Sequence, residues 1–137
     1  MPAATIPLRA GTTVQTTVAL TSVALSQPQP LDLAVYRGDT GGFRVTVTDA
    51  DGLPVDVSTR TWLSQIRATA DSADPPMAVL TITPVAGDTA SIDVTLDAAN
   101  SAKLKGTTGG WDLQMSDGAN ITTLLAGKVL ITPDYSR

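Results

Sequence analysis

Cysteine, histidine and glutamate are all absent from this chain of 137 residues. Without cysteine there is neither a disulfide framework nor a thiol nucleophile, and without histidine there is no Ser-His-Asp arrangement and no common zinc ligand. The only acidic side chains are 13 aspartates. We therefore expect a protein that is not an enzyme and that has no catalytic residues, no cofactor and no metal site.

Basic residues are also few, because Lys and Arg together number 9 and the net charge is −4. They do not cluster, and nucleic-acid affinity depends on clustered Lys and Arg, so we expect no nucleic-acid partner. The N-terminal residues lack the basic segment and apolar run of a signal peptide. The most apolar stretch, Val14 to Leu25, contains polar residues and is too short to cross a bilayer. We expect no membrane partner.

Good helix formers such as Glu and Lys are scarce or absent, whereas there are 21 threonines, 11 glycines and 9 prolines. This composition favours β-strands joined by frequent turns. The length suits a single domain that removes about two-thirds of its unfolded surface from water.

The charge distribution divides the chain into two parts. Residues 1–31 carry a single charge, that of Arg9, whereas all other charged residues follow. The segment Ser26-Gln27-Pro28-Gln29-Pro30 predicts an extended linker, because proline holds its predecessor extended and has no backbone donor. We therefore predict an N-terminal arm and linker over residues 1–30 and a folded domain over residues 31–137.

The arm is rich in Thr and Val, and an isolated strand is marginal in water. Three interpretations remain open: the arm is disordered, it adds an edge strand to its own domain, or it pairs with a neighbouring subunit by strand addition. The candidate assembly residues are apolar: Val14, Val18, Leu20, Val23 and Leu25.

The folded part predicts seven short strands separated by turn residues, near 31–36, 42–49, 61–69, 78–84, 90–96, 111–116 and 121–132. The last is expected to break at Gly127. One helix of about two turns is predicted from Asp97 to Lys105, with Asp97 as its N-cap, Lys103 and Lys105 at its C-terminal end, and Gly106 after it. In the strand 61–69, both faces are mixed, so the inward face is left open.

The most specific segment runs from Tyr36-Arg37-Gly38-Asp39-Thr40 through the alternating Phe43 to Thr48 and then Asp49-Ala50-Asp51-Gly52-Leu53-Pro54-Val55-Asp56. This strand, turn and strand pattern resembles the small immunoglobulin-like modules of tailed-bacteriophage virions, found in minor tail, tail-tip and baseplate proteins. The resemblance covers the chain from about Leu31 to the end. It implies an all-β, immunoglobulin-like β-sandwich of about seven strands, with one short helix bridging the sheets and an extended N-terminal arm.

By the same resemblance, the expected function is structural: a minor tail or tail-tip component that mediates assembly or fibre attachment. Its partners would be other virion proteins and symmetric copies of itself, and it would be made in the host cytoplasm and located in the virion. Two alternatives remain: a capsid decoration or head-fibre protein, and a host cell-wall carbohydrate-binding module. The latter would use Trp62 or Trp111 as a stacking platform, but we expect both to be buried in the core.

Several motifs have both a functional and a structural interpretation. Asp49 to Asp56 has the oxygen density of a calcium loop but lacks the closing bidentate Glu, which favours a hairpin turn with Gly52 at positive φ. The integrin tripeptide Arg37-Gly38-Asp39 falls where a turn is needed, and we expect Asp39 and Thr40 to bond backbone donors there.

Paired carboxylates for acid–base chemistry are the remaining catalytic option. The candidates are the aspartates at 88, 93, 97, 112 and 117. We expect Asp88 and Asp117 in turns and Asp97 as a helix cap, and we expect Asp93 to face solvent because it alternates with Ile92 and Val94.

Overall fold

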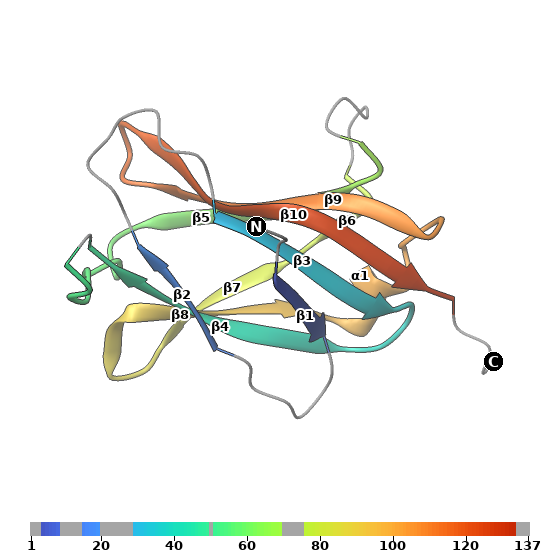
Figure 1. The fold of residues 1–137 in the computed structure, drawn as a ribbon, viewed down its shortest axis with the longest axis horizontal. Helices are drawn as coiled ribbons and strands as arrows, with labels where there is room; N and C mark the ends of the chain where they lie inside the picture. The colour runs from blue at the N-terminus through green and yellow to red at the C-terminus, as the bar shows by residue number, and fades with distance from the viewer. Residues whose placement is uncertain (1–3, 9–14, 20–28, 50, 70–75, 134–137) are drawn as a thin grey trace.

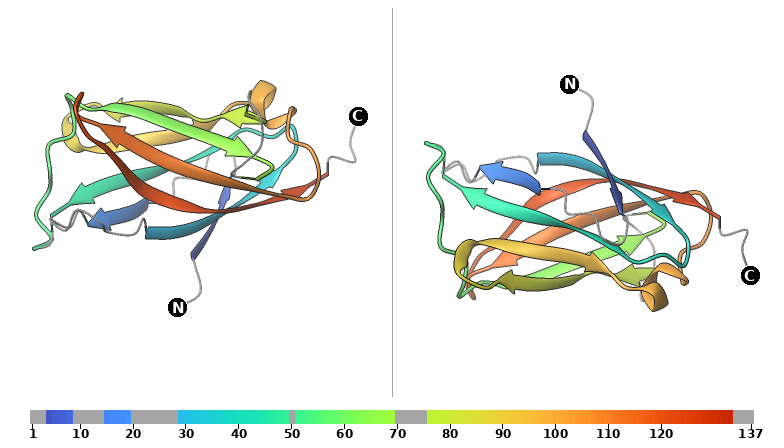
Figure 2. Two further views of the ribbon diagram at one scale, coloured as in Figure 1. Left: turned by 90° about the horizontal axis from the view of Figure 1, so that it is seen from above. Right: turned by 90° about the horizontal axis from the view of Figure 1, so that it is seen from below.

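A computed structural model describes residues 4–8, 15–19, 29–49, 51–69 and 76–133. In these residues, ten strands form two sheets that pack face to face, with a single four-residue helix (Figures 1 and 2). The chain is therefore all-β, as its composition predicts.

The larger sheet, sheet A, has six strands in the order β1-β3-β10-β9-β5-β6. The bounds are β1 (Ala4–Leu8), β3 (Gln29–Tyr36), β10 (Ile121–Thr132), β9 (Thr108–Ser116), β5 (Thr61–Arg67) and β6 (Ala78–Val79). The strands β1, β3 and β10 run parallel, whereas β9 is antiparallel to both β10 and β5.

The second sheet, sheet B, has four strands in the order β2-β4-β8-β7. The bounds are β2 (Gln15–Ala19), β4 (Gly41–Thr48), β8 (Asp88–Leu96) and β7 (Thr81–Val85). Here β2 runs parallel to β4, and the other neighbours are antiparallel.

Without β1 and β2, the arrangement is that of an immunoglobulin-like sandwich: β4, β8 and β7 form one sheet, and β5, β9 and β10 belong to the other. The predicted fold class is confirmed. The predicted strand 78–84 divides at Leu80 into β6 and β7, which belong to different sheets. The predicted break at Gly127 is wrong, because β10 is continuous and its register shifts between Thr123 and Leu125 instead.

The core lies between the two sheets and follows from residue alternation. In β3 and β4, alternate residues are buried: Leu31, Leu33, Val35, Phe43, Val45 and Val47. The rings of Phe43 and Trp111 meet edge to face, with centroids 5.8 Å apart. Each fully buried Leu, Val or Phe side chain contributes about 1.5–3 kcal/mol relative to exposure, so this alternation is the main source of stability.

The helix α1 (Ala98–Ser101) joins β8 of sheet B to β9 of sheet A. Asp97 is its N-cap as predicted, because its carboxylate accepts a hydrogen bond from Asn100 N at 2.7 Å. The predicted extension to Lys105 is wrong. The amides of Lys103 and Leu104 bond carbonyls three residues back, which tightens the chain, and Leu104 turns into the core.

The linker prediction is also wrong at its C-terminal end, because Gln29 and Pro30 are the first residues of β3. Pro30 pairs in register with Ala126 of β10, while the pairing of β1 with β3 begins only at Leu31. The side of Pro30 away from β10 therefore has no strand beside it among the described residues, and a missing N–H is tolerated at such a position.

Candidate functional site

The N-terminal strands are the part of the fold that a minimal sandwich does not need. Strand β1 pairs with β3 from Ala4 opposite Leu31 to Leu8 opposite Val35. Strand β2 pairs with β4 from Gln15 opposite Arg44 to Ala19 opposite Thr48. The arm therefore adds an outer strand to each sheet of its own domain (Figure 1).

The ten paired residues of β1 and β2 carry no charge. Of the predicted arm residues, Val18 lies in β2 opposite Val47. The other four, Val14, Leu20, Val23 and Leu25, lie outside the described residues. Main-chain hydrogen bonds thus define how the described arm attaches, and such bonds are largely independent of side-chain identity.

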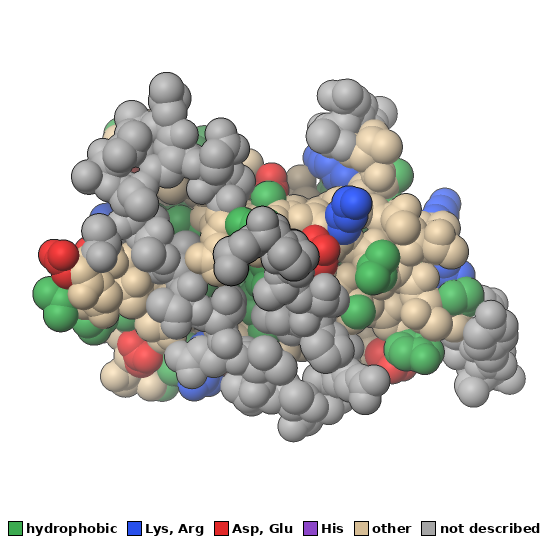
Figure 3. Space-filling view, viewed as in Figure 1, with side chains coloured by type: hydrophobic (Ala, Val, Ile, Leu, Met, Phe, Trp, Pro, Cys, Tyr) green, Lys and Arg blue, Asp and Glu red, His purple; other side chains and the backbone are tan. Residues whose placement is uncertain are grey.

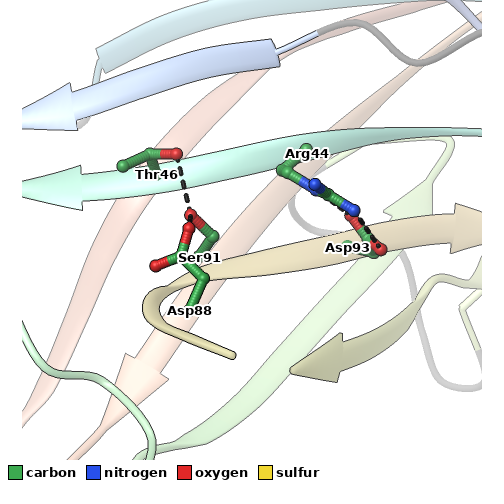
Figure 4. A network of polar contacts seen from close by, with 5 residues as sticks. All are labelled: Arg44, Thr46, Asp88, Ser91 and Asp93. Atoms are coloured by element: carbon green, nitrogen blue, oxygen red, sulfur yellow. Dashed lines mark hydrogen bonds and ion pairs between the residues drawn. The ribbon is translucent and has the colours of Figure 1, made fainter. Parts of the chain in front are cut away.

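The outer face of sheet B carries an ion pair between neighbouring strands (Figure 4). Arg44 Nε donates to Asp93 Oδ1 at 2.8 Å, and a second Arg44 nitrogen donates to Asp93 Oδ2 at 3.2 Å. The bidentate contact raises the pKa of Arg44, mainly through the hydrogen bond. Both side chains are 36% exposed, as expected for Asp93, so the pair orients the two strands and adds little stability.

Next to this pair, Ser91 links two further polar residues (Figure 4). Its hydroxyl lies 2.9 Å from Thr46 Oγ1 and donates to Asp88 Oδ2 at 2.7 Å. The other oxygen of Asp88 accepts from Ala90 N at 3.0 Å. These hydrogen bonds lower the pKa of Asp88, which therefore stays ionised at neutral pH. Its carboxylate is suited to fixing the first residues of β8 and not to proton transfer.

A hollow of about 430 Å³ lies on the outer face of sheet A. Gly110 and Gly127 contribute backbone without side chains, and Arg67, Asp112 and Gln114 contribute polar groups. Burial raises the pKa of Asp112, while the charge of Arg67 and a hydrogen bond from Gln114 oppose the shift. A single half-buried carboxyl lacks the second group that glycosidase-type acid–base chemistry requires.

The other predicted acid–base candidates have separate structural roles. Asp117 Oδ1 accepts from Ala119 N at 3.0 Å and from Asn120 N at 2.8 Å, which confirms its turn role. Asp97 caps α1. Asp88, expected in a turn, is the first residue of β8 and directly follows Gly87 at positive φ. Each of the five aspartates thus has its own structural contacts, although Asp88 and Asp93 both lie near Arg44.

The acidic segment begins with a turn at Asp49, Asp51 and Gly52, as its residues favour, and Pro54 and Val55 pair back with the end of β4. Asp49 Oδ1 accepts from Asp51 N at 2.9 Å and from Leu53 N at 3.0 Å, and Gly52 has φ of 83°. Asp56 Oδ1 instead accepts hydrogen bonds from the amide and from the hydroxyl of Ser58. Among the described residues, no three acidic side chains gather as metal ligands.

The tripeptide Arg37-Gly38-Asp39 forms a turn that is held against α1. Gly38 N donates to Ser101 Oγ at 2.9 Å, and a guanidinium nitrogen of Arg37 donates to Gly106 O at 3.0 Å. Asp39 and Thr40 were expected to accept the hydrogen bonds of the backbone N–H groups in this turn, and this is wrong. The acceptor for Gly38 N is the hydroxyl of the buried Ser101, which lies 63 residues away in the sequence. No local pattern marks such a distant partner.

The two tryptophans differ in environment. Trp111 is 4% exposed, as predicted. Trp62 is less buried than Trp111 but packs against the core, so the prediction that both tryptophans are buried holds fully for Trp111 and in part for Trp62. On β5 the inward face is that of Ser64 and Ile66, while Leu63 on the opposite face is 47% exposed. The exposure of Leu63 could not be predicted from the sequence, because both faces of β5 mix apolar and polar residues.

Charges of both signs are interspersed on the face seen in Figure 3, where no cluster of one sign stands out. No helix in the described part of the chain has the length and apolar character needed to span a membrane. Neither a scan against protein-family models nor a search of curated proteins gives a match.

Proposed function

We propose that this chain is a structural protein of a tailed-bacteriophage virion, a minor tail or tail-tip component that mediates assembly or fibre attachment. The observation that carries the proposal is the attachment of two uncharged N-terminal strands to the two sheets, β1 to β3 and β2 to β4. This module uses main-chain pairing at sheet edges as its means of attachment.

The same pairing gives the arm a means of joining subunits. Strands β3 and β4 present edges that accept an uncharged strand in parallel register. Since the contact is made by backbone groups, the corresponding arm of a neighbouring copy fits the same edges. We propose that the arm exchanges between neighbouring copies in the particle, while each sandwich acts as a rigid body.

The polar groups of the described residues support a structural role. The Arg44–Asp93 pair and the Asp88–Ser91 contact join parts of sheet B to one another. The side chains of Asp49, Asp97 and Asp117 bond backbone amides in turns and at the helix cap. These groups are engaged in holding the fold, and a virion component needs such rigidity more than it needs a reactive site.

A mass-spectrometric census of purified tails and of purified capsids tests the location. We expect peptides of this chain in tails at a fixed ratio to the other tail proteins and none in capsids. Their presence in capsids alone would instead identify a capsid decoration or head-fibre protein. Absence from both particles would reject the virion role.

Two adjacent proline variants of β2, Thr16→Pro and Thr17→Pro, test the role of the arm. Only one of two neighbouring residues in a strand points its N–H toward β4, so only one variant loses a hydrogen bond to β4, and the other acts as its control. We expect the disruptive variant to be incorporated poorly into particles and its control to be incorporated normally. Equal incorporation of both would contradict the proposed attachment.

A further inference from the structure

The hollow on the outer face of sheet A is a feature that a purely structural role does not require. It lies over β10, β9 and β5, which are side by side in the left view of Figure 2. Gly110 of β9 pairs with Arg67 of β5. Asp112 pairs with Gln65 of β5 and with Ala126 of β10. Small residues thus lie beside long ones on the same face, and this difference in length forms the hollow.

The polar side chains of the hollow hold one another in place. A guanidinium nitrogen of Arg67 donates to Gln65 Oε1 at 3.1 Å, and Gln114 contributes a side-chain hydrogen bond to the Asp112 carboxylate. A glutamine amide has a donor end and an acceptor end. These contacts use the oxygen of Gln65 and the NH₂ group of Gln114, so the NH₂ group of Gln65 and the oxygen of Gln114 can serve a ligand. Such ordered groups lose little entropy on binding.

The charges around the hollow favour a neutral ligand. Of the described residues that line it, Arg67 and Asp112 are charged, one of each sign. Lys128 lies opposite Gly110 on β10 and is exposed at the margin. An anion would meet the half-buried carboxylate of Asp112, and a cation would meet the two basic groups. Neither sign of ligand charge is therefore complementary to the hollow.

The chemistry of the lining also decides against an apolar molecule and against a peptide. An apolar ligand would cover the two glutamine amides and the Asp112 carboxylate without bonding them, which is costly. An extended peptide binds by pairing with free main-chain groups at a sheet edge. The main chain of β9 is already paired with β5 on one side and with β10 on the other.

We infer that this hollow binds a short neutral saccharide. Each hydroxyl group both donates and accepts, so neighbouring hydroxyls of a sugar ring can bond the NH₂ group of Gln65, the Asp112 carboxylate and the Gln114 oxygen. Leu63, which is 47% exposed, also lines the hollow and can contact the C–H groups of the ring. The volume of about 430 Å³ is within the range of about 300–1,000 Å³ typical of small-molecule sites. Neither tryptophan serves as a stacking platform in this arrangement.

Titration of the ¹⁵N-labelled full chain with saccharides, followed by two-dimensional NMR, tests the site. The probes are neutral di- and trisaccharides of glucose, galactose, mannose and N-acetylglucosamine, each to about 20 mM, which detects millimolar dissociation constants. Trigalacturonic acid is the anionic probe. We expect at least one neutral probe to shift the backbone amide signals of Gly110, Asp112 and Gln114 and the side-chain amide signals of Gln65. The anionic probe should bind more weakly.

Two variants alter the hollow in different ways. Gly110→Val fills it with a side chain that suits a strand, and Asp112→Asn removes the charge of the central acceptor. Each should weaken binding by about tenfold or more. Leu130→Phe is the matched control for Gly110→Val, because it enlarges an exposed side chain of sheet A that does not line the hollow. It should bind as the parent does.

The absence of shifts with every neutral probe would overturn the inference, as would shifts confined to residues away from the hollow. Tighter binding of the anionic probe would reject a neutral ligand. Unchanged binding by Asp112→Asn would reject the site, and this variant decides the question if Gly110→Val does not fold. The test uses the isolated chain, so its result is independent of whether the protein belongs to a virion.

Discussion

The indole Nε1 of Trp111 donates a buried hydrogen bond of 2.8 Å to the main-chain oxygen of Leu31. Trp111 lies on β9 and Leu31 on β3, and β10 runs between these strands. The pairing of β3 with β10 is interrupted between Pro30 and Leu33, and Lys128 N donates there to Asp32 Oδ1. Side chains of β9 and β3 therefore complete the hydrogen bonding where the two parallel strands do not.

Trp111→Phe should reduce the free energy of unfolding by about 1–3 kcal/mol, because it leaves the buried carbonyl of Leu31 without its donor. Trp62→Phe is the matched control and should cost less, since Trp62 is only partly buried. Urea unfolding of the two variants measures the difference. Equal losses would mean that the hydrogen bond to Leu31 does not matter for stability.

Gly127→Ala should destabilise the domain strongly, because a Cβ at this position would overlap the main-chain oxygen of Leu31. Gly110→Ala on the neighbouring strand is the control, since its Cβ would meet only Gly127 O at an ordinary 3.7 Å. We expect a melting temperature several degrees lower for Gly127→Ala and almost no change for Gly110→Ala. Similar melting of the two variants would show that β10 can move away from β3.

Stability should be nearly constant from about pH 5 to pH 8, because no histidine titrates in that range. Hydrogen bonds lower the pKa of Asp56, Asp88, Asp97 and Asp117 in the fold. A lowered folded pKa stabilises the protein above the unfolded pKa, and this contribution is lost as the pH falls through the folded pKa. Melting temperatures should therefore drop below about pH 4, and constant melting down to about pH 2 would contradict this.

Asp112 should behave in the opposite way, because burial raises its pKa in the fold. Its ionised form costs stability at neutral pH, and the cost disappears below the unfolded pKa. We expect Asp112→Asn to melt higher than the parent at about pH 7 and to match it at about pH 3. The control Asp88→Asn should melt lower at neutral pH, because its pKa shift has the opposite sign. A lower melting temperature for Asp112→Asn would refute the burial argument.

Calcium should not stabilise the domain. Asp49 already uses one carboxylate oxygen for two backbone amides, and Asp56 bonds Ser58, so the segment offers too few uncommitted ligands for this cation. Thermal melts with EDTA and with millimolar calcium should agree within the error of the measurement. A rise of several degrees with calcium would identify the segment as a metal site after all.

Local chemistry made several features predictable. The alternation of β3 and β4 indicated which side chains are buried, and the Asp49 to Gly52 turn and the Asp97 cap each follow from hydrogen bonds within a few residues. The length of α1 was overestimated because its end depends on Leu104 packing into a distant core. The hydrogen bond from Gly38 to Ser101 could not be predicted either, because the two residues are 63 positions apart in the sequence.

By itself the sequence determined the β-rich class, most strand positions and the turns, because these depend on period-two alternation and on Gly and Asp preferences over a few residues. Only the tertiary structure decided which sheet each strand joins. It separates β6 from β7 at Leu80, attaches the arm to β3 and β4, and turns Ser64 and Ile66 inward while Leu63 stays exposed. Any strand can satisfy its backbone bonds with several partners, so the choice depends on contacts between residues far apart in the chain.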